Sequence, residues 1–136
     1  MTTSLNPTQI GDISEAIVRA RFIQKGFVVL MPLNSGLRYD IVVEKDGIFR
    51  RVQIKTGRLL DTGVVFFNTS SLDPKTRNSQ LDYYNDVEWF AVYCPQNEKV
   101  YLLDVAELPP RNSHLRIDPP KNGQRHGIRW AKDYEF

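Results

Sequence analysis

The segment YDIVVEKDGIFRRVQIK, residues 39–55, carries an acid near its start and an amide and an amine near its end: Asp40, Gln53 and Lys55. Carboxylate and amide oxygens are hard ligands of the kind that Mg²⁺ takes from proteins, and this ion keeps several of its waters. A lysine beside such an ion can position or deprotonate a water, or stabilise negative charge that grows on a phosphate. These residue types together favour metal-assisted hydrolysis of a phosphodiester.

A β-hairpin is the element that would bring these three side chains together. Two apolar-alternating runs flank Asp46-Gly47, a dipeptide typical of two-residue hairpin turns. With that turn, Asp40 opposes Gln53, and directly opposed residues lie about 5 Å apart at Cβ on one face. Lys55 shares this face because it lies two residues beyond Gln53. The opposite face is predicted to be apolar and to carry Ile41, Val43, Val52 and Ile54.

Two further oxygen donors are candidates for the same cation. The main-chain carbonyl of Ile54 lies on the second hairpin strand, between the amide and the amine. Glu15 belongs to a predicted helix, where 100° per residue places it with Gly11, Val18 and Phe22 at the margin of the apolar face. Gly11, one turn earlier, leaves room for something to approach. We expect a carboxylate at this margin to reach over the sheet to the cation.

Hydrophobic spacing and turn signals predict the elements that position these residues. A helix is predicted to open at Asn6-Pro7 or Thr8 and to run to Lys25, before Gly26, with a buried stripe of Ile10, Ile13, Ile17 and Ala20. Strands are predicted over residues 27–31, 64–67, 88–94 and 100–103, besides the hairpin, and a short helix over residues 105–108 after Asp104. Residues 68–87 are predicted to form a polar excursion with a helical turn near 81–84, and the pattern from Pro109 onward is irregular. The predicted fold class is α/β, a mixed central sheet of about five or six strands with flanking helices.

Length and composition indicate one globular domain. The chain has 136 residues, and no apolar run approaches the roughly 20 residues of a membrane span. The first residues lack the basic start and the apolar stretch of a signal peptide. Cys94 is the only cysteine, which predicts no internal disulfide. These features together predict a cytoplasmic protein.

The net charge of +2 is unevenly distributed along the chain. Residues 1–108 hold 12 Lys or Arg against 13 Asp or Glu, whereas residues 109–136 hold 6 against 3. We therefore divide the chain into a core over residues 1–108 and a basic C-terminal segment over residues 109–136. This segment is expected to pack on the core, to contact the phosphates of a nucleic acid or to build an oligomer.

Glu15 in GDISEAIV, Asp40 in RYDIVV and Gln53-Ile54-Lys55 in RVQIKTG, in this order, resemble the PD-(D/E)xK nuclease superfamily. The resemblance covers residues 10 to about 103, is most specific over residues 38–57, and is closest to the small homing endonucleases encoded in group I introns. It implies a restriction-endonuclease-like core and a Mg²⁺-dependent endonuclease. Asp40 would be a metal ligand, Lys55 the catalytic lysine and Glu15 an auxiliary acid. Gln53 stands where the family usually has a second acid, so Glu15 is expected to compensate for the lost charge.

The resemblance also implies partners. Double-stranded DNA is the expected substrate, and sequence-specific recognition is expected. Because one domain holds one active site, cutting both strands implies a homodimer or a homotetramer, which would read a symmetric or nearly symmetric target. The candidate DNA-contacting residues lie in loops and in the polar excursion: Ser35, Arg38, Thr56, Lys75 and Arg77.

Three other functions are compatible with the same residues. A Holliday-junction resolvase would recognise the shape of its substrate more than the sequence. A DNA-binding module on the nuclease fold would have lost activity, because the neutral Gln53 binds Mg²⁺ more weakly than a carboxylate does. A structural or partner-binding protein unrelated to DNA would lack the steep salt dependence that phosphate contacts impose.

Overall fold

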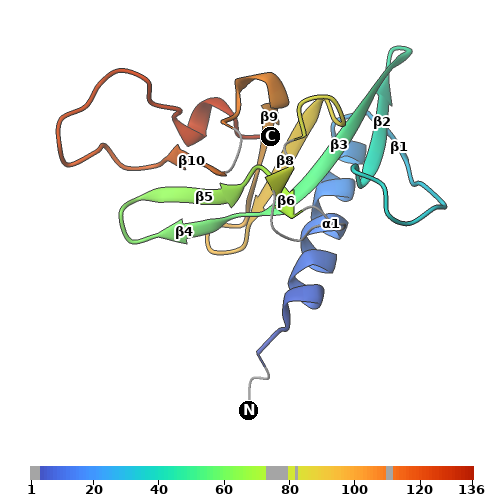
Figure 1. The fold of residues 1–136 in the computed structure, drawn as a ribbon, viewed down its shortest axis with the longest axis horizontal. Coiled ribbons are helices and arrows are strands. Elements are labelled where there is room, and N and C mark those ends of the chain that lie inside the picture. Colours follow the sequence, from blue (N-terminus) through green and yellow to red (C-terminus); the bar gives the residue numbers. More distant parts are fainter. Residues whose placement is uncertain (1–3, 73–79, 82, 110–111) are drawn as a thin grey trace.

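The computed structural model describes residues 4–72, 80–81, 83–109 and 112–136 of the chain. Its elements are α1 (Pro7–Gln24), β1 (Val28–Leu30), β2 (Ile41–Lys45), β3 (Ile48–Thr56), β4 (Arg58–Leu60), β5 (Val64–Asn68), β6 (Ser71–Leu72), β7 (Gln80–Leu81), β8 (Trp89–Cys94), β9 (Lys99–Asp104), the 3₁₀ turn η1 (Val105–Glu107), β10 (Asn112–Arg116) and the 3₁₀ turn η2 (Ala131–Asp133). The central sheet has the strand order β1-β2-β3-β8-β9, and α1 packs on one of its faces (Figure 1). A second sheet has the order β10-β5-β4, and β6 pairs with β7.

The predicted α/β class and the mixed sheet are confirmed. In the central sheet β3 and β8 run parallel, whereas the β1–β2, β2–β3 and β8–β9 pairs are antiparallel. Of the flanking helices, the described residues contain the α-helix α1 and two 3₁₀ turns. No helix in the described part of the chain is long and apolar enough to cross a membrane.

The β2–β3 hairpin has the predicted turn and register. Asp46 and Gly47 form the turn with φ angles of 54° and 79°, the left-handed backbone that a type I′ turn requires. Lys45 opposes Ile48, and the ladder continues from there to the pair of Ile41 and Val52. The predicted apolar face of the hairpin is buried at all four positions: Ile41, Val43, Val52 and Ile54.

The ends of α1 also agree with the prediction. The Asn6 side chain accepts a hydrogen bond from the Gln9 N–H at 2.9 Å, and the Gln9 side chain accepts one from the Asn6 N–H at 2.9 Å, which makes a capping box. At the other end, Gly26 has a φ of 87°, the left-handed conformation that commonly ends helices.

The predicted buried stripe of α1 is wrong. None of its four residues is buried: Ile10 and Ile17 are half-buried, and Ile13 and Ala20 are exposed. The buried residues are Ser14, Val18 and Phe22, which follow one another at intervals of four. Because Ser14 is polar, these three residues do not form a hydrophobic pattern in the sequence. The buried Ser14 hydroxyl is hydrogen-bonded to the Ile10 carbonyl and the Thr56 hydroxyl, so it is not left unsatisfied.

The central sheet separates two hydrophobic cores. One core joins α1 to the apolar face of the hairpin. The other contains Phe90 and Val92 of β8, part of β9 and the inner face of the second sheet. Gln53 pairs with Phe90 and Lys55 with Val92, so Gln53 and Lys55 point to the face of the sheet opposite α1.

The structure places the strand predicted at residues 64–67 in a second sheet rather than in the central one. This strand is β5, with β4 on one side and β10 on the other. The sequence pattern predicts neither neighbour. Strand β4 has only three residues, and β10 has the single apolar residue Leu115 among four polar ones and lies in the segment predicted to be irregular. Both strands are defined by their pairing with β5 rather than by their own pattern.

Two shorter predictions also meet the structure. The helical turn predicted near residues 81–84 is wrong, because Gln80–Leu81 form β7 and residues 84–86 form a turn. The short helix after Asp104 is present as the 3₁₀ turn η1, and the Asp104 side chain accepts from the Ala106 N–H at 2.9 Å.

The last residues of the chain pack beside α1. The ring of Phe136 lies 4.9 Å from that of Phe22 and 6.3 Å from that of Phe27, measured between centroids. The Phe136 N–H donates to the Val100 carbonyl at 2.8 Å, and the Arg21 guanidinium donates to the Phe136 carbonyl. These contacts attach the end of the chain to both α1 and the edge strand β9.

Gly57 is buried at the junction of β3 and β4, where no side chain fits. A Cβ at this position would lie 2.8 Å from Cγ1 of Val65 and 2.9 Å from Cγ1 of Val92. We expect Gly57→Ala to lower the free energy of unfolding by about 1–3 kcal/mol, the usual cost of overpacking a core. Urea unfolding followed by circular dichroism would measure this change.

Gly11 provides the matched control for this substitution. It lies inside α1, and a Cβ there would meet nothing within 4 Å. Gly11→Ala is therefore expected to raise stability by up to about 1 kcal/mol through helix propensity. Equal destabilisation by the two substitutions would contradict the close packing around Gly57.

Candidate functional site

Asp40 lies immediately before β2, at the end of the hairpin opposite the turn. Its N–H donates to the Val52 carbonyl at 2.9 Å, and its Oδ2 accepts from the Ile54 N–H at 2.7 Å. This short, charge-assisted bond holds the carboxylate against β3, just beyond the point where β2 stops pairing with it. The β2–β3 ladder ends at the pair of Ile41 and Val52, so the predicted pairing of Asp40 with Gln53 is not part of it.

The main-chain oxygen of Ile54 belongs to the same edge of β3. A paired residue in an antiparallel ladder uses its N–H and its C=O at the same edge of the strand. Since the Ile54 N–H bonds to Asp40, the Ile54 carbonyl also points toward this edge. The carboxylate and the carbonyl are thus two neighbouring oxygen donors.

Gln53 and Lys55 extend the site onto the adjoining face of β3. Both side chains are half-buried. The Lys55 ammonium lies 5.1 Å from the centroid of the Tyr83 ring, and its positive charge lowers the pKa of Asp40. Among the residues that the structure describes, Lys55 forms no ion pair, and the Gln53 amide has no hydrogen-bond partner. Both groups are therefore available to a ligand.

Glu15 approaches this group from α1. Burial raises the pKa of Glu15, and the negative charge of Asp40 raises it further, while Arg19 lowers it. Arg19 lies one turn along the helix, with its Nη1 3.8 Å from Oε2 of Glu15. Glu15 is half-buried. The two carboxylates are thus close enough to repel each other, as expected for ligands of one cation.

The environment of Asp40 disfavours the ionised form of its carboxyl group. Burial raises the pKa of Asp40 above its ordinary value. The hydrogen bond from the Ile54 N–H and the charge of Lys55 act in the opposite direction, and the net result is still a raised pKa. A divalent cation at this position would favour the ionised form of both acids.

A pair of hydroxyls fixes α1 to β3 beside the site. The Ser14 and Thr56 hydroxyl oxygens are 2.6 Å apart, and Ser14 also donates to the Ile10 carbonyl at 3.1 Å. Ser14 precedes Glu15, and Thr56 follows Lys55. The pair therefore sets the position of the helix acid relative to the strand lysine. Ser14 has no role predicted from the sequence, and Thr56 is predicted only as a candidate DNA contact.

Tyr83 is a second residue that the sequence analysis does not assign to the site. It is buried, and its ring packs edge-on against Phe90 with centroids 5.3 Å apart. The guanidinium carbon of Arg38 lies 3.9 Å from the ring centroid of Tyr83, and Nε of Arg38 lies 3.2 Å from Oδ2 of Asp86. Two cationic side chains, Arg38 and Lys55, thus lie near the Tyr83 ring. The sequence of residues 68–87, predicted to be a polar excursion, gives no sign of these contacts.

Of the three remaining candidate DNA-contacting residues, the structure describes Ser35 alone. Ser35 is exposed in the loop between β1 and β2. Lys75 and Arg77 lie outside the described residues.

The donor set suits a hard cation. In the described part of the chain, no three His, Cys, Asp or Glu side chains form a cluster able to hold a metal ion. The available donors are instead two carboxylates, an amide oxygen and a main-chain carbonyl: Glu15, Asp40, Gln53 and Ile54. An all-oxygen set of this kind fits Mg²⁺, which keeps several waters, better than Zn²⁺, which prefers nitrogen and sulfur.

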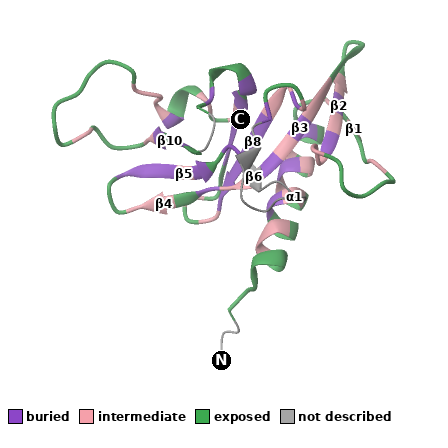
Figure 2. Cartoon of the chain, viewed as in Figure 1, coloured by how far each residue is buried: buried purple, intermediate pink, exposed green. Residues whose placement is uncertain are grey.

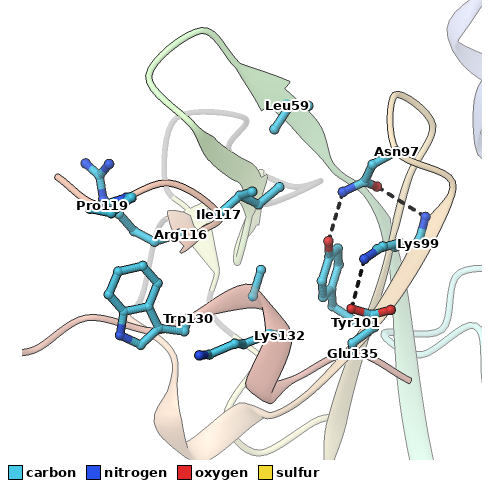
Figure 3. A pocket seen from close by; sticks show the side chains of 11 residues that line it. Leu59, Asn97, Lys99, Tyr101, Arg116, Ile117, Pro119, Trp130, Lys132 and Glu135 are labelled. Atoms are coloured by element: carbon cyan, nitrogen blue, oxygen red, sulfur yellow. Dashed lines mark hydrogen bonds and ion pairs between the residues drawn. The ribbon is translucent and has the colours of Figure 1, made fainter.

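A cleft of about 440 Å³ between β9 and the C-terminal segment contains none of these residues. Figure 3 shows its polar wall, where Asn97 bonds to the Tyr101 hydroxyl at 2.9 Å and Lys99 pairs with Glu135 at 3.1 Å. The polar groups of this wall are thus already paired with one another, and the oxygen donors of the candidate site lie elsewhere.

Comparison with known proteins gives three similarities. A sequence profile of the PD-(D/E)XK endonuclease family matches residues 5–136. Protein 5.3 of Escherichia phage T7 is 38% identical over 52 residues, which are 38% of this chain and 44% of that protein, so the match spans less than half of this relative. The solved structure of the bacterial homing endonuclease I-Ssp6803I superposes with a TM-score of 0.77 and 24% identity, covering 96% of this chain and 89% of that one. This structural likeness shows a shared fold.

Proposed function

The chain belongs to the PD-(D/E)XK endonuclease family, and we propose that it uses Mg²⁺ to hydrolyse phosphodiester bonds in double-stranded DNA. The observation that carries this proposal is the Asp40 carboxylate. Its Oδ2 accepts a hydrogen bond from the Ile54 N–H at 2.7 Å. The charge of Lys55 lowers the pKa of Asp40, and the charge of Asp40 raises the pKa of Glu15. Two acids and a lysine meet here around one end of β3.

Each residue has a proposed role. Asp40 and Glu15 supply negative charge for Mg²⁺, and the Gln53 amide oxygen and the Ile54 carbonyl complete the protein ligands. When bound, Mg²⁺ activates water and neutralises charge on the phosphate. Lys55 has two alternative roles: as the neutral amine it accepts the proton of the attacking water, and as the ammonium it orients the water and stabilises the negative charge of the phosphate.

We further propose that the enzyme is sequence-specific and of the homing type. The shared fold with a bacterial homing endonuclease supports this proposal. One chain provides one such site, so a double-strand cut calls for a homodimer or a homotetramer. Light scattering coupled to gel filtration should show two or four chains, and a monomer at the assay concentration would contradict the assembly.

Cleavage of a complex pool of duplex DNA tests the function itself. Discrete cuts that need Mg²⁺ and disappear in EDTA are the expected result, and mapping their ends would define the target. Preferential cutting of four-way junctions would identify a junction resolvase instead. Salt-sensitive DNA binding without any cleavage would indicate an inactive module, and cleavage restored by Gln53→Glu would trace that inactivity to the neutral amide.

Cation binding should also change thermal stability in a pH-dependent way. Because the folded-state pKa values of Glu15 and Asp40 are raised, these groups stabilise the metal-free fold at acid pH. They lose that contribution as the pH rises through the raised values. At neutral pH a saturating cation is expected to raise the Tm by about 5 °C, the gain from a concentration about ten times the Kd.

Differential scanning calorimetry with MgCl₂ or EDTA would measure this gain. Protons compete with the cation, so the gain should shrink near pH 4, around the ordinary pKa of carboxyl groups. Glu15→Gln should reduce the gain at neutral pH. A gain that is independent of pH and unchanged in Glu15→Gln would place the cation elsewhere.

A further inference from the structure

The β10-β5-β4 sheet has two faces of opposite character. Its inner face is apolar and belongs to the hydrophobic core, with Leu59, Val65, Phe67 and Leu115. Its outer face consists of the alternate residues of the same strands. Figure 2 shows β5 largely buried, while exposed positions alternate along β10. The sheet is therefore anchored on its inner face, and its outer face is exposed at Arg58, Asn68, Asn112 and His114 but buried at Val64.

The outer face combines cationic, amide and aromatic side chains in register. Arg58, Phe66 and His114 form one row across the three strands, and Asn68 pairs with Asn112 in the next row. Except for the half-buried Phe66, these side chains are exposed. The Arg58 guanidinium lies 6.0 Å from the Phe66 ring centroid. In this described sheet, no Asp or Glu occupies any strand position on either face.

This face begins directly beside the candidate site. Lys55 and Thr56 end β3, and Arg58 opens β4 after one intervening glycine. A groove of about 330 Å³ joins Thr56 to Arg58, Phe66 and Asn68. In Figure 1, β4 and β5 extend away from the end of β3 as a ribbon. If the DNA backbone binds at Lys55, the base pairs next to the bound phosphate would contact β4 and β5.

We propose that the outer face of the β10-β5-β4 sheet enters the major groove of duplex DNA and reads base edges through Arg58, Asn68 and Asn112. Arginine pairs bidentately with guanine, asparagine pairs with adenine, and an apolar group such as the Phe66 ring suits a thymine methyl. Neighbouring strands lie about 5 Å apart, and the major groove, about 12 Å wide, admits a two-stranded β-ribbon.

Arg116 has a different place on the same face. Its Nη1 donates to the Thr62 carbonyl at 3.3 Å and to the Asp118 carbonyl at 3.4 Å. A guanidinium that is held by main-chain oxygens at the far end of the ribbon suits a contact with the DNA backbone. Among the described residues, the Arg58 guanidinium donates no such hydrogen bond and forms no ion pair, and it lies 6.0 Å from the Phe66 ring centroid. We therefore assign Arg116 to a positioning contact with the DNA backbone and Arg58 to base readout.

This inference rests on the proposed function, because the surface matters only if the protein binds DNA. The test uses the Lys55→Ala protein, which should bind without cutting, to select targets from a random duplex pool. The same selection is run with Arg58→Ala, Asn68→Ala or Asn112→Ala added. Lys45→Ala, which removes one positive charge at the far end of the hairpin, is the control. Thermal melting confirms that each variant is folded.

Each base-reading variant should lose preference at one or two positions of the selected motif. Its affinity for that motif should fall between about 5-fold and about 150-fold, the range that one bidentate base contact supplies. Binding to unselected duplex should change much less, and Lys45→Ala should select the original motif.

Three outcomes would overturn the inference, and they differ in whether the proposed function also fails. If the variants select the original motif with the original affinity while the wild type still cleaves, bases are read elsewhere and the proposed function stands. If the parent protein binds all duplexes equally, no base-reading surface exists. If it binds no duplex and the wild type cleaves none, the proposed function fails together with this surface.

Discussion

Replacing Lys55 with alanine should lower the rate of DNA cleavage by at least about 100-fold, the usual contribution of a single proton-transfer or charge-stabilising group. The ammonium lies on the Tyr83 ring and interacts with Asp40, and no carboxylate among the described residues forms an ion pair with it. Its charge is therefore available to the phosphate. Single-turnover cleavage of a mapped target at saturating Mg²⁺ would measure the loss.

Two variants make this result specific. Lys45→Ala removes the same charge from the other end of β2 and should leave the cleavage rate within about two-fold, because an exposed substitution away from the site changes little. Lys55→Arg keeps the charge but cannot give up a proton near neutral pH. Recovery by arginine would assign Lys55 to charge stabilisation, and no recovery would assign it to proton transfer. A fully active Lys55→Ala enzyme would remove Lys55 from the site.

Asp40→Asn should have the second large effect and should separate activity from stability. Asparagine keeps an oxygen that can accept from the Ile54 N–H but loses the negative charge needed by the cation. We expect the cleavage rate to fall by at least about 100-fold, as for loss of a main charge-stabilising group. The Tm gain on adding Mg²⁺ should disappear.

The metal-free Asp40→Asn protein should nevertheless be more stable than the wild type at neutral pH. The raised pKa of Asp40 means that folding disfavours its ionised form, and the substitution removes this cost. Thermal melts in EDTA at pH 7 would show the gain, which should vanish at acid pH, where Asp40 is protonated. Asp133→Asn, in the exposed part of η2, is the control that should change neither property. A destabilised, cation-responsive Asp40→Asn protein would contradict the assignment.

Local signals in the sequence predict the hairpin completely and the helix only in part. Asp46-Gly47 and the flanking alternation determine which residues of β2 and β3 oppose each other, since a two-residue turn leaves one register. The ends of α1 are equally local, because they depend on the Asn6 cap and on Gly26. Local signals do not determine which face of α1 is buried. The isoleucines predict one face, but Ser14 is buried on another, where Thr56, 42 residues away, provides a partner for its hydroxyl.

The second sheet shows the same limit on a larger scale. Neither β4 nor β10 carries a sufficient pattern alone, and both depend on β5 for their hydrogen bonds. Because Gly57 has no side chain, the chain can pass from β3 directly into β4 with Val65 and Val92 packed closely against it.

By itself, the sequence determined the order of the acids and the lysine, the register of β2 against β3, and the family resemblance, because all three depend on neighbours in the chain or on short-range turn geometry. Only the tertiary structure decided that the charge of Asp40 acts on Glu15, that Arg38 and Lys55 lie near the Tyr83 ring, and that an arginine and two asparagines lie on one sheet face. These relations join residues that are distant in the chain. Burial and strand pairing create them, and no local pattern encodes which distant partner each residue meets.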